Sequence, residues 1–470
     1  MTIIQIAFLA AAALILGRLP KGRQMGLMVV STFVVFWLQP AEPFVSLMFW
    51  LPVATLTITV VAWVLTSAPE VRGWKQNWPA IATLVGVILL VDLNRYFNLT
   101  QVYMSATPSL AITLIVLTAI GTATLLLALW QRSHRIWLAI AFLAIILVFL
   151  FLKIPQLTRL ALTSFTNVHG QNPDMADFAF SWLGFSYLAF RLMHTIRDRQ
   201  SGRLPAVTLA EYVNYVIFFP AFTAGPIDRL ERFVKELRTP LPMEDEDWID
   251  AGTRLFVGLF KKFVLAYLLS VISISDVLIP QVRGGGWMWL FLYAYALQIY
   301  LDFSGYTDVA IGLGRLLGIR LPENFAAPYL KPNLTQFWNS WHMTLTQWFR
   351  SYFFNPLTRA LRSGKRLPVW LIIFTTQIST MILIGLWHGG TLNYILWGTW
   401  HGAGLFIHNR WSELVRNRMP AWTQSPRGQM ATNALGVFLT FNYVALGWLF
   451  FTLSTPAIAW QAMLKLLGLA

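Results

Sequence analysis

Residues 385–402 read GLWHGGTLNYILWGTWHG. The stretch is apolar and aromatic enough to enter a lipid bilayer, yet it contains two histidines, His388 and His401, each between a tryptophan and a glycine. Ionisable side chains at membrane depth are costly and therefore mark candidate functional sites. The simpler alternative for both is hydrogen bonding or packing between helices. Two questions follow: whether the chain is a membrane protein, and what the two imidazoles do.

The composition of the whole chain answers the first question. The chain has 470 residues, of which 57% are hydrophobic and 12% charged, whereas a soluble domain has about 25% charged residues. We therefore expect an all-α polytopic membrane protein. The net charge of +15 is explained by cytoplasmic loops rich in Lys and Arg, so no nucleic-acid partner is expected. The absence of cysteine excludes disulfides, Cys-ligated metal and a Cys nucleophile.

Apolar runs long enough to span a bilayer recur along the chain. A span needs about 20 mostly apolar residues, and we expect about 11 to 13 membrane helices, some only partly inserted. The candidate runs are 3–17, 26–39, 44–66, 78–93, 108–130, 136–152, 176–193, 210–225, 253–279, 287–303, 368–387, 391–407 and 431–453.

Basic clusters predict which ends of these helices are cytoplasmic. The positive residues Arg18, Lys21 and Arg23 follow the first apolar run. This order is the reverse of a cleavable signal, so we expect a retained first helix. Further clusters are Arg72/Lys75, Arg132/Arg135, Arg191/Arg197/Arg199/Arg203 and Lys365/Arg366.

Two later segments, 210–250 and 315–366, are too charged for simple spans and too aromatic for simple loops. We expect interfacial or re-entrant helices on the cytoplasmic side. Within the first, FFPAFTAGPIDR (218–229) contains Pro220, Gly225 and Pro226, which break a helix. A re-entrant element lining a cavity fits this pattern; the alternative is a kinked span.

A third histidine lies in the second segment. Residues 333–352, NLTQFWNSWHMTLTQWFRSY, place aromatic and leucine side chains at helical spacing and predict an amphipathic helix, with His342 at the edge of its apolar face. A solvated interfacial histidine is the simpler interpretation. However, burial disfavours the imidazolium, so a buried histidine stays neutral and can accept a proton, as a general base must.

Other polar groups in apolar surroundings receive structural interpretations. Asp302 and Asp308 lie among aromatic residues in 295–319, and we expect local donors such as Ser304 or an Arg to satisfy them. Neither a metal-binding HExxH helix, a phosphate-binding loop, a dinucleotide fingerprint nor a GxSxG elbow occurs, so no metal site is expected. Base catalysis or a substrate path remains.

Four stretches together resemble the membrane-bound O-acyltransferase family, in the bacterial branch that includes membrane subunits of alginate O-acetylation and lipoteichoic-acid D-alanylation. They are FFPAFTAGPIDR (218–229), LQIYLDFSGYTDVAIGLGRLLGIRLPENFAAPYL (297–330), FWNSWHMTLTQWFRSYFFNPL (337–357) and GLWHGGTLNYILWGTWHG (385–402). The resemblance implies a single integral-membrane domain, 1–470, with peripheral helices in 1–180, a catalytic core in 185–405 and C-terminal helices in 406–470. It also implies a helix bundle whose amphipathic and re-entrant cytoplasmic helices form a funnel.

The resemblance places the family's invariant histidine at His388 and its second functional histidine at His342. Where the family usually has Asp after the Arg of its W-[FL]-R-D-Y stretch, this chain has Ser351 after Arg350. We expect Trp338, Trp341, Trp387 and Asn393 to contact substrate, with Asn393 or an indole N–H as an oxyanion donor. Asp302, Asp308 and His401 are expected to be structural or to support the site.

The implied reaction moves an acyl group from a thioester, acetyl-CoA or an acyl carrier, to a hydroxyl, with no bound cofactor. Acetyl transfer to an exported or cell-surface polysaccharide is the first hypothesis; D-alanyl transfer to teichoic acid is the second. A transporter or flippase of an acyl carrier or glycan, and a scaffold, are the non-catalytic alternatives. The expected partners are the lipid bilayer, a cytoplasmic acyl carrier and an extracytoplasmic acyltransferase, and the expected location is the bacterial cytoplasmic membrane.

One geometric difficulty follows from these assignments. Lys365 and Arg366 predict that the run 368–387 begins inside, and at about 1.5 Å per residue a straight helix carries His388 most of the way across the bilayer. His342 should lie near the inner face. If the two histidines share one site, the amphipathic segment must dip inward or the later helix must tilt.

Overall fold

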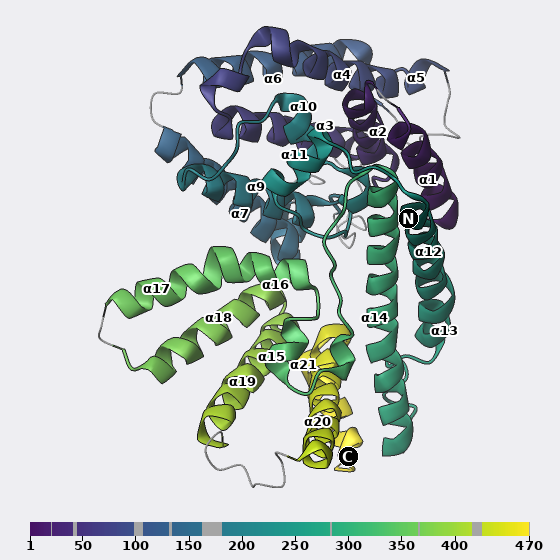
Figure 1. Ribbon diagram of the computed structural model, residues 1–470, viewed down its shortest axis with the longest axis vertical. Coiled ribbons are helices and arrows are strands. Elements are labelled where there is room, and N and C mark those ends of the chain that lie inside the picture. The colour runs from purple at the N-terminus through teal and green to yellow at the C-terminus, as the bar shows by residue number, and fades with distance from the viewer. Residues whose placement is uncertain are drawn as a thin grey trace. The chain divides into compact units, whose positions relative to one another are not determined.

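The computed structural model describes residues 1–19, 21–40, 45–97, 107–130, 134–161, 181–282, 284–364, 367–415 and 425–469. Within these ranges the regular secondary structure is helical throughout (Figure 1), which confirms the all-α expectation. Lys365 and Arg366, which carried the inside assignment of the run that follows them, lie outside the described residues, as does Arg132.

The chain divides into two compact units, and each is described by itself. The first consists of Met1–Leu255 with Val309–Leu321, and the second of Phe256–Asp308 with Pro322–Ala470. The division of the chain into 1–180, 185–405 and 406–470 stays a prediction. The first unit contains α1 (Ile3–Gly17), α2 (Arg23–Trp37), α3 (Val45–Thr66), α4 (Trp74–Asp92), α5 (Asn94–Phe97), α6 (Leu110–Trp130), α7 (His134–Lys153), α9 (Phe185–Gln200), α10 (Leu209–Val216), α11 (Leu230–Arg238) and most of α12 (Asp245–Phe260).

The second unit carries the three histidines of interest. Its helices are α13 (Ala266–Val271), most of α14 (Gly285–Leu316), α15 (Leu334–Trp338), α16 (Met343–Phe349), α17 (Asn355–Ser363), α18 (Val369–His388), α19 (Leu392–Val415), α20 (Pro426–Thr452) and α21 (Pro456–Leu466).

Five helices among the described residues are long and apolar enough to cross a membrane: Leu47–Thr66, Leu110–Leu129, Arg135–Lys153, Val369–His388 and Pro426–Thr452. Only 6% of the Leu110–Leu129 window is buried, so its apolar side chains face outward, as lipid contact requires. These helices establish a multi-pass membrane protein, and the total of 11 to 13 membrane helices stays a prediction.

The predicted helix break near residue 220 is present in the first unit. Helix α10 ends at Val216, and a short 3-10 turn, Phe219–Ala221, follows. The guanidinium of Arg191, on α9, donates to the carbonyls of Val216 (2.7 Å) and Ala221 (2.8 Å). Because buried carbonyls freed by a break need donors, Arg191 stabilises this irregular backbone. Whether the break lines a cavity stays a prediction.

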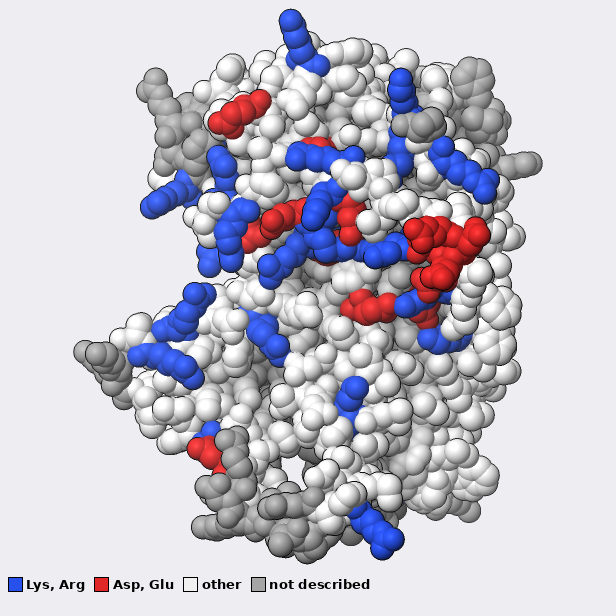
Figure 2. All heavy atoms as spheres, in the orientation of Figure 1, with Lys and Arg blue, Asp and Glu red and all other residues white. Residues whose placement is uncertain are grey.

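Some of the surface charges form ion pairs. On the face shown in Figure 2, acidic and basic side chains gather side by side, and wide areas carry neither. In the first unit Arg232 pairs with both Asp228 and Glu236, and Arg238 pairs with Glu211 at 2.6 Å. The uncharged areas are those expected of a surface that lies in lipid.

In the second unit, two consecutive lysines satisfy the two carboxylates of α14. Lys262 Nζ lies 2.5 Å from Asp302 Oδ1, and Lys261 Nζ lies 2.7 Å from Asp308 Oδ2. Both lysines belong to a π-helical turn, Lys261–Leu265, that follows α12. A Cβ on Gly305 would meet the Gly258 carbonyl oxygen at 2.7 Å, so Gly305 allows close approach. The sequence interpretation named Ser304 or an Arg as the donor, but the partners are lysines.

The prediction of one continuous amphipathic helix over 333–352 is wrong. The chain forms α15, leaves the helix at Asn339, and resumes as α16 after His342, which has a left-handed backbone (φ 43°, ψ 54°). A π-helical turn, Arg350–Phe354, then leads into α17. Helical periodicity persists across the break because both pieces bury the same kind of face, so spacing alone does not reveal it.

Helices α18 and α19 form a hairpin that contains the stretch 385–402, and they lie side by side (Figure 1). A Cβ on Gly385 would meet the Tyr394 carbonyl oxygen at 2.1 Å, and one on Gly398 would meet the Met381 carbonyl oxygen at 2.5 Å. Only glycine permits this approach, since any side chain would push the helices apart. These glycines therefore serve close helix packing.

Candidate active site

His342 is held by its backbone and by one loop residue, Asn324. The Met343 N–H donates to the Asn324 carbonyl at 2.9 Å, and the Thr344 hydroxyl donates to Asn324 Oδ1 at 2.6 Å. The same Oδ1 lies 3.3 Å from His342 Nδ1. A left-handed conformation at a non-glycine residue costs about 1 kcal/mol or more and persists only where its surroundings enforce it. Asn324, fully buried, supplies that enforcement.

The His342 ring is enclosed by aromatic side chains. Its ring centroid lies 4.7 Å from that of Phe303 and 6.0 Å from that of Trp387, and the residue is 2% exposed. Burial lowers the pKa of His342 to about 3, so the imidazole is neutral at physiological pH. Its Nε2 is buried and makes no hydrogen bond to the described residues.

His388 is the last residue of α18, and it is less buried than His342. Its ring centroid lies 4.5 Å from that of Trp387, 4.7 Å from that of Phe451 and 5.5 Å from that of Trp397. The Trp387 ring thus contacts both histidines. The fold therefore brings His342 and His388 to one tryptophan although they are 46 positions apart in the sequence. His342 reaches Trp387 from the break between the short helices α15 and α16, and not from a continuous helix.

His401 lies in the middle of α19, on the same Trp397 ring that contacts His388. It is fully buried, and its ring makes edge contacts with Trp338 (5.1 Å between centroids) and Trp397 (5.0 Å). Neither ring nitrogen makes a hydrogen bond to the described residues. Of the two roles considered from the sequence, packing is the one this geometry favours.

The other residues expected at the site lie close by. Trp341 is buried against Phe337 and Trp448, with centroid distances of 5.6 and 5.2 Å. Asn393 donates from Nδ2 to the Leu453 carbonyl at 2.5 Å and is also buried. That bond joins α19 to the end of α20. Substrate contact by Trp338, Trp341, Trp387 and Asn393 stays a prediction.

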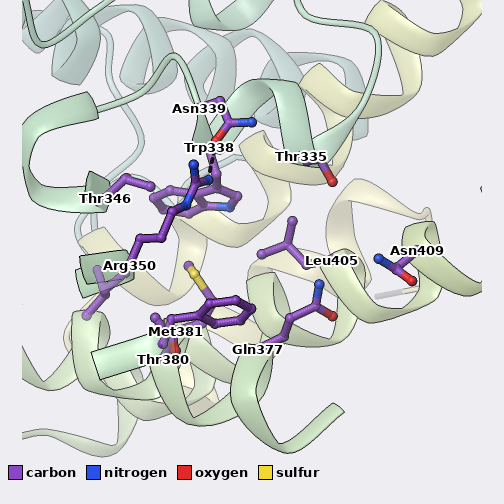
Figure 3. A pocket seen from close by; sticks show the side chains of 12 residues that line it. Thr335, Trp338, Asn339, Thr346, Arg350, Gln377, Thr380, Met381, Leu405 and Asn409 are labelled. Atoms are coloured by element: carbon purple, nitrogen blue, oxygen red, sulfur yellow. Dashed lines mark hydrogen bonds between the residues drawn. The ribbon is translucent and has the colours of Figure 1, made fainter. Parts of the chain in front are cut away.

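A cavity of about 220 Å³ adjoins this cluster within the second unit. Figure 3 shows Trp338 and Arg350 on one wall, with Gln377 and Met381 opposite. Arg350 donates to Asn339 Oδ1 at 2.5 Å, and this bond fixes the guanidinium at the exposed rim. The lining residues are Thr335, Trp338, Asn339, Thr346, Arg350, Phe354, Gln377, Thr380, Met381, Ile384, Leu405 and Asn409.

The cavity offers unused hydrogen-bonding atoms as well as a charge. Trp338 Nε1 and Gln377 Oε1 are buried and have no partner among the described residues. Buried polar atoms are normally paired, so such atoms identify places where a ligand can bind. The floor contains Met381 and Ile384, and Ile384 lies one helical turn before His388. The cavity is thus polar at its rim and apolar toward the histidines.

Two site features were not anticipated from the residues alone. Asn324 lies inside the quoted stretch 297–330, but nothing in its spacing connects it with His342, 18 positions later. Gln377 is the one amide side chain in a span whose other polar residues before His388 are threonines and a serine, and a polar group in such a span is a functional candidate that the sequence could have indicated. The part of the chain that the structure describes contains no group of three His, Cys, Asp or Glu side chains suited to a metal.

Comparison with known proteins supports the resemblance seen in the sequence. The model of the MBOAT, membrane-bound O-acyltransferase family matches residues 93–450. The matched range includes His342, His388, Asn324 and every residue that lines the cavity.

The relatives of this chain are named for different acyl groups and acceptors. The teichoic acid D-alanyltransferase of Streptococcus thermophilus is 32% identical over 287 residues, covering 58% of this chain and 68% of the relative. The probable alginate O-acetylase of Pseudomonas aeruginosa is 30% identical over 332 residues, covering 70% and 60%. The peptidoglycan O-acetyltransferase of Helicobacter pylori is 31% identical over 271 residues, covering 55% and 47%.

Proposed function

The chain belongs to the membrane-bound O-acyltransferase family and is an O-acyltransferase, and we propose that it transfers an acetyl group from a thioester donor to a hydroxyl of an exported or cell-surface polysaccharide. The observation that carries the proposal is the contact of both His342 and His388 with Trp387. Two imidazoles around one aromatic wall can serve a single pair of reactants. The bacterial cytoplasmic membrane is the proposed location.

The proposed chemistry needs only proton transfer and positioning. The acceptor hydroxyl oxygen attacks the thioester carbonyl carbon, a C–O bond forms and the C–S bond breaks. His388 takes the hydroxyl proton as the attack proceeds and returns it to the leaving thiolate, so that a thiol departs. His342 holds one of the reactants by a hydrogen bond. Partial exposure of His388 gives a reactant access to it.

The cavity beside Trp338 is the proposed position of the thioester donor. Its apolar floor at Met381 and Ile384 suits a short acyl group, and its cationic rim at Arg350 suits an anionic or polar remainder of the donor. CoA and an acyl carrier protein on the cytoplasmic side both have such a remainder.

Trp338→Phe, which removes the unpartnered N–H, should raise the KM for the donor with little change in kcat.

Deletion of the gene followed by mass analysis of cell-surface glycans tests the proposal. Loss of acetyl esters, restored by the wild-type gene and not by His388→Ala produced at the same membrane level, supports acetyl transfer. An equal acetyl content in deleted and wild-type cells contradicts it. An extracytoplasmic acyltransferase partner would appear as a second gene whose deletion gives the same loss.

D-alanyl transfer to teichoic acid is the second candidate, and the relative from Streptococcus thermophilus favours it. The same mass analysis separates the two, because D-alanyl and acetyl esters differ in mass and only the former carries an amine. A transporter without chemistry predicts that His388→Ala still moves its cargo, since proton transfer is then not required.

A further inference from the structure

The Asn324 side chain has a defined orientation. The backbone N–H of Thr344 points at Oδ1 at 3.3 Å, and the Thr344 hydroxyl donates to it at 2.6 Å. A backbone N–H can only donate, so the atom that faces it must be the carbonyl oxygen of the amide and not its NH₂. The assignment of oxygen and nitrogen in Asn324 therefore follows from its partners.

This orientation decides which nitrogen of His342 carries the proton. Asn324 Oδ1 lies 3.3 Å from His342 Nδ1, and an amide oxygen can only accept. Nδ1 must therefore be the N–H of the ring. Since His342 is buried and neutral, Nε2 then has the lone pair. That atom makes no hydrogen bond to the described residues.

We propose that Asn324 is a positioning residue that holds His342 in the Nδ1–H tautomer, so that Nε2 is a hydrogen-bond acceptor in the active site. The proposal rests on the acyl-transfer function proposed above. It deepens that function because it states that His342 accepts, and does not donate, the hydrogen bond to its reactant. An Nε2 lone pair can accept a hydrogen bond from a second hydroxyl of the acceptor sugar, or from the thiol product once His388 has returned the proton to sulfur. It cannot donate to the thioester carbonyl or to an oxyanion.

The surroundings of His342 allow this role to be measured by pH. The groups that contact its ring are Phe303 from α14, Asn324 from the loop and Trp387 from α18. None of them titrates near neutrality. The ionisable residues next to these contacts in sequence are Glu323, which is exposed, Asp302, which is paired with Lys262, and His388, whose ring contacts Trp387 and not His342 in the described structure. A carboxylate placed at 324 would therefore be the one charge in contact with the ring.

The first experiment reads the tautomer directly and needs no activity. Full-length protein labelled with ¹⁵N-histidine in lipid nanodiscs gives separate signals for protonated and lone-pair ring nitrogens, and His342→Gln identifies the His342 pair by their loss. We expect a protonated Nδ1 and an unprotonated Nε2 in the wild type, and a mixture of tautomers in Asn324→Leu. A wild-type spectrum with the proton on Nε2 overturns the proposal.

The second experiment follows acyl transfer as a function of pH in three variants. Asn324→Leu removes the acceptor and should lower kcat at least about tenfold with little change in KM, because the ring loses its tautomer and not its substrate. Asn324→Asp keeps the acceptor and adds a charge, which favours the imidazolium. It should retain substantial activity while the acidic limb of its pH profile moves to higher pH.

Thr344→Val is the matched control. It removes the hydroxyl bond to the same Asn324 oxygen but leaves the His342 contact and the Thr344 N–H in place. It should lower thermal stability without moving the pH profile. If Asn324→Asp leaves the acidic limb where the wild type has it, or if Asn324→Leu keeps the wild-type kcat, the positioning role is wrong. If His342→Gln is itself fully active, the proposed function fails while the tautomer assignment can still stand.

Discussion

Two buried histidines, His194 in the first unit and His342 in the second, differ in what their Nε2 atoms contact. His194 Nδ1 lies 3.0 Å from the Tyr215 hydroxyl, which donates its own proton to the Asp228 carbonyl, so Nδ1 is the N–H in this ring also. At the other nitrogen, the Leu230 N–H points at His194 Nε2 at 3.5 Å. In His342 the corresponding Nε2 has no partner among the described residues.

The proposal treats His194 as a structural histidine and His342 as a chemical one, and it rests on this difference together with the contact between His342 and Trp387. Both residues are 2% exposed, and burial lowers both pKa values to about 3, with Arg229, Arg191 and Arg203 adding to the effect at His194. Burial and pKa therefore do not distinguish them. What distinguishes them is that both ring nitrogens of His194 face groups of the chain, with Asp198 Oδ2 also 3.7 Å from Nε2, whereas Nε2 of His342 has no partner among the described residues.

The largest expected effect is at His388, which the proposal makes the proton acceptor. His388→Ala should lower acyl transfer by about 10² to 10⁴, while the protein still inserts and keeps its helix content. The measurement is product formation in purified membranes, with circular dichroism on the same sample. Product formation at the wild-type rate would contradict the assignment of His388 as the base.

His342→Gln should have the next largest effect, a loss of about 10²-fold in kcat. The amide is close in size to imidazole but does not place a hydrogen-bond acceptor where Nε2 lies. The paired variant His194→Gln should show wild-type kcat per folded molecule, because His194 belongs to the first unit's internal hydrogen bonds. Equal losses of kcat in both variants would remove the distinction between the two histidines.

His194→Gln should instead lower stability, by about 1–3 kcal/mol, because the substitution disturbs buried hydrogen-bond partners at Tyr215 and Leu230. Thermal unfolding in detergent, followed by tryptophan fluorescence, measures the change. A thermal midpoint equal to that of the wild type would show that these bonds contribute little.

The last expected effect is a dependence of stability on pH that the two histidines share. A histidine in the unfolded chain takes up a proton below about pH 6.5, whereas these two stay neutral until about pH 3. Acidification therefore favours the unfolded state, and stability should be constant above about pH 7 and fall below it by about 1.4 kcal/mol per pH unit for each histidine. Thermal midpoints at pH 8, 6 and 5 test this, and His342→Gln and His194→Gln should each reduce the slope. A midpoint that rises on acidification would contradict the neutral assignment of both rings.

Much of the second unit was predictable because its signals are local. The span Val369–His388 agrees with the predicted run 368–387 to within one residue at each end, since an apolar run of that length determines a membrane helix. Pro220 and Gly225 marked a real break, since proline and glycine act on their own backbone. The sequence did not show that the Tyr394 ring covers Gly389, next to His388, where a Cβ would lie 2.4 Å from the ring.

Sequence by itself thus determined the membrane class, the helical fold, the family and the pair of histidines, because composition, apolar length and contiguous motifs are properties of the chain as written. Only the tertiary structure decided that His342 interrupts its helix, that Trp387 contacts both histidines, and that Asn324 assigns the proton on His342. These facts depend on contacts between residues distant in sequence, and on which hydrogen bonds those contacts leave unmade.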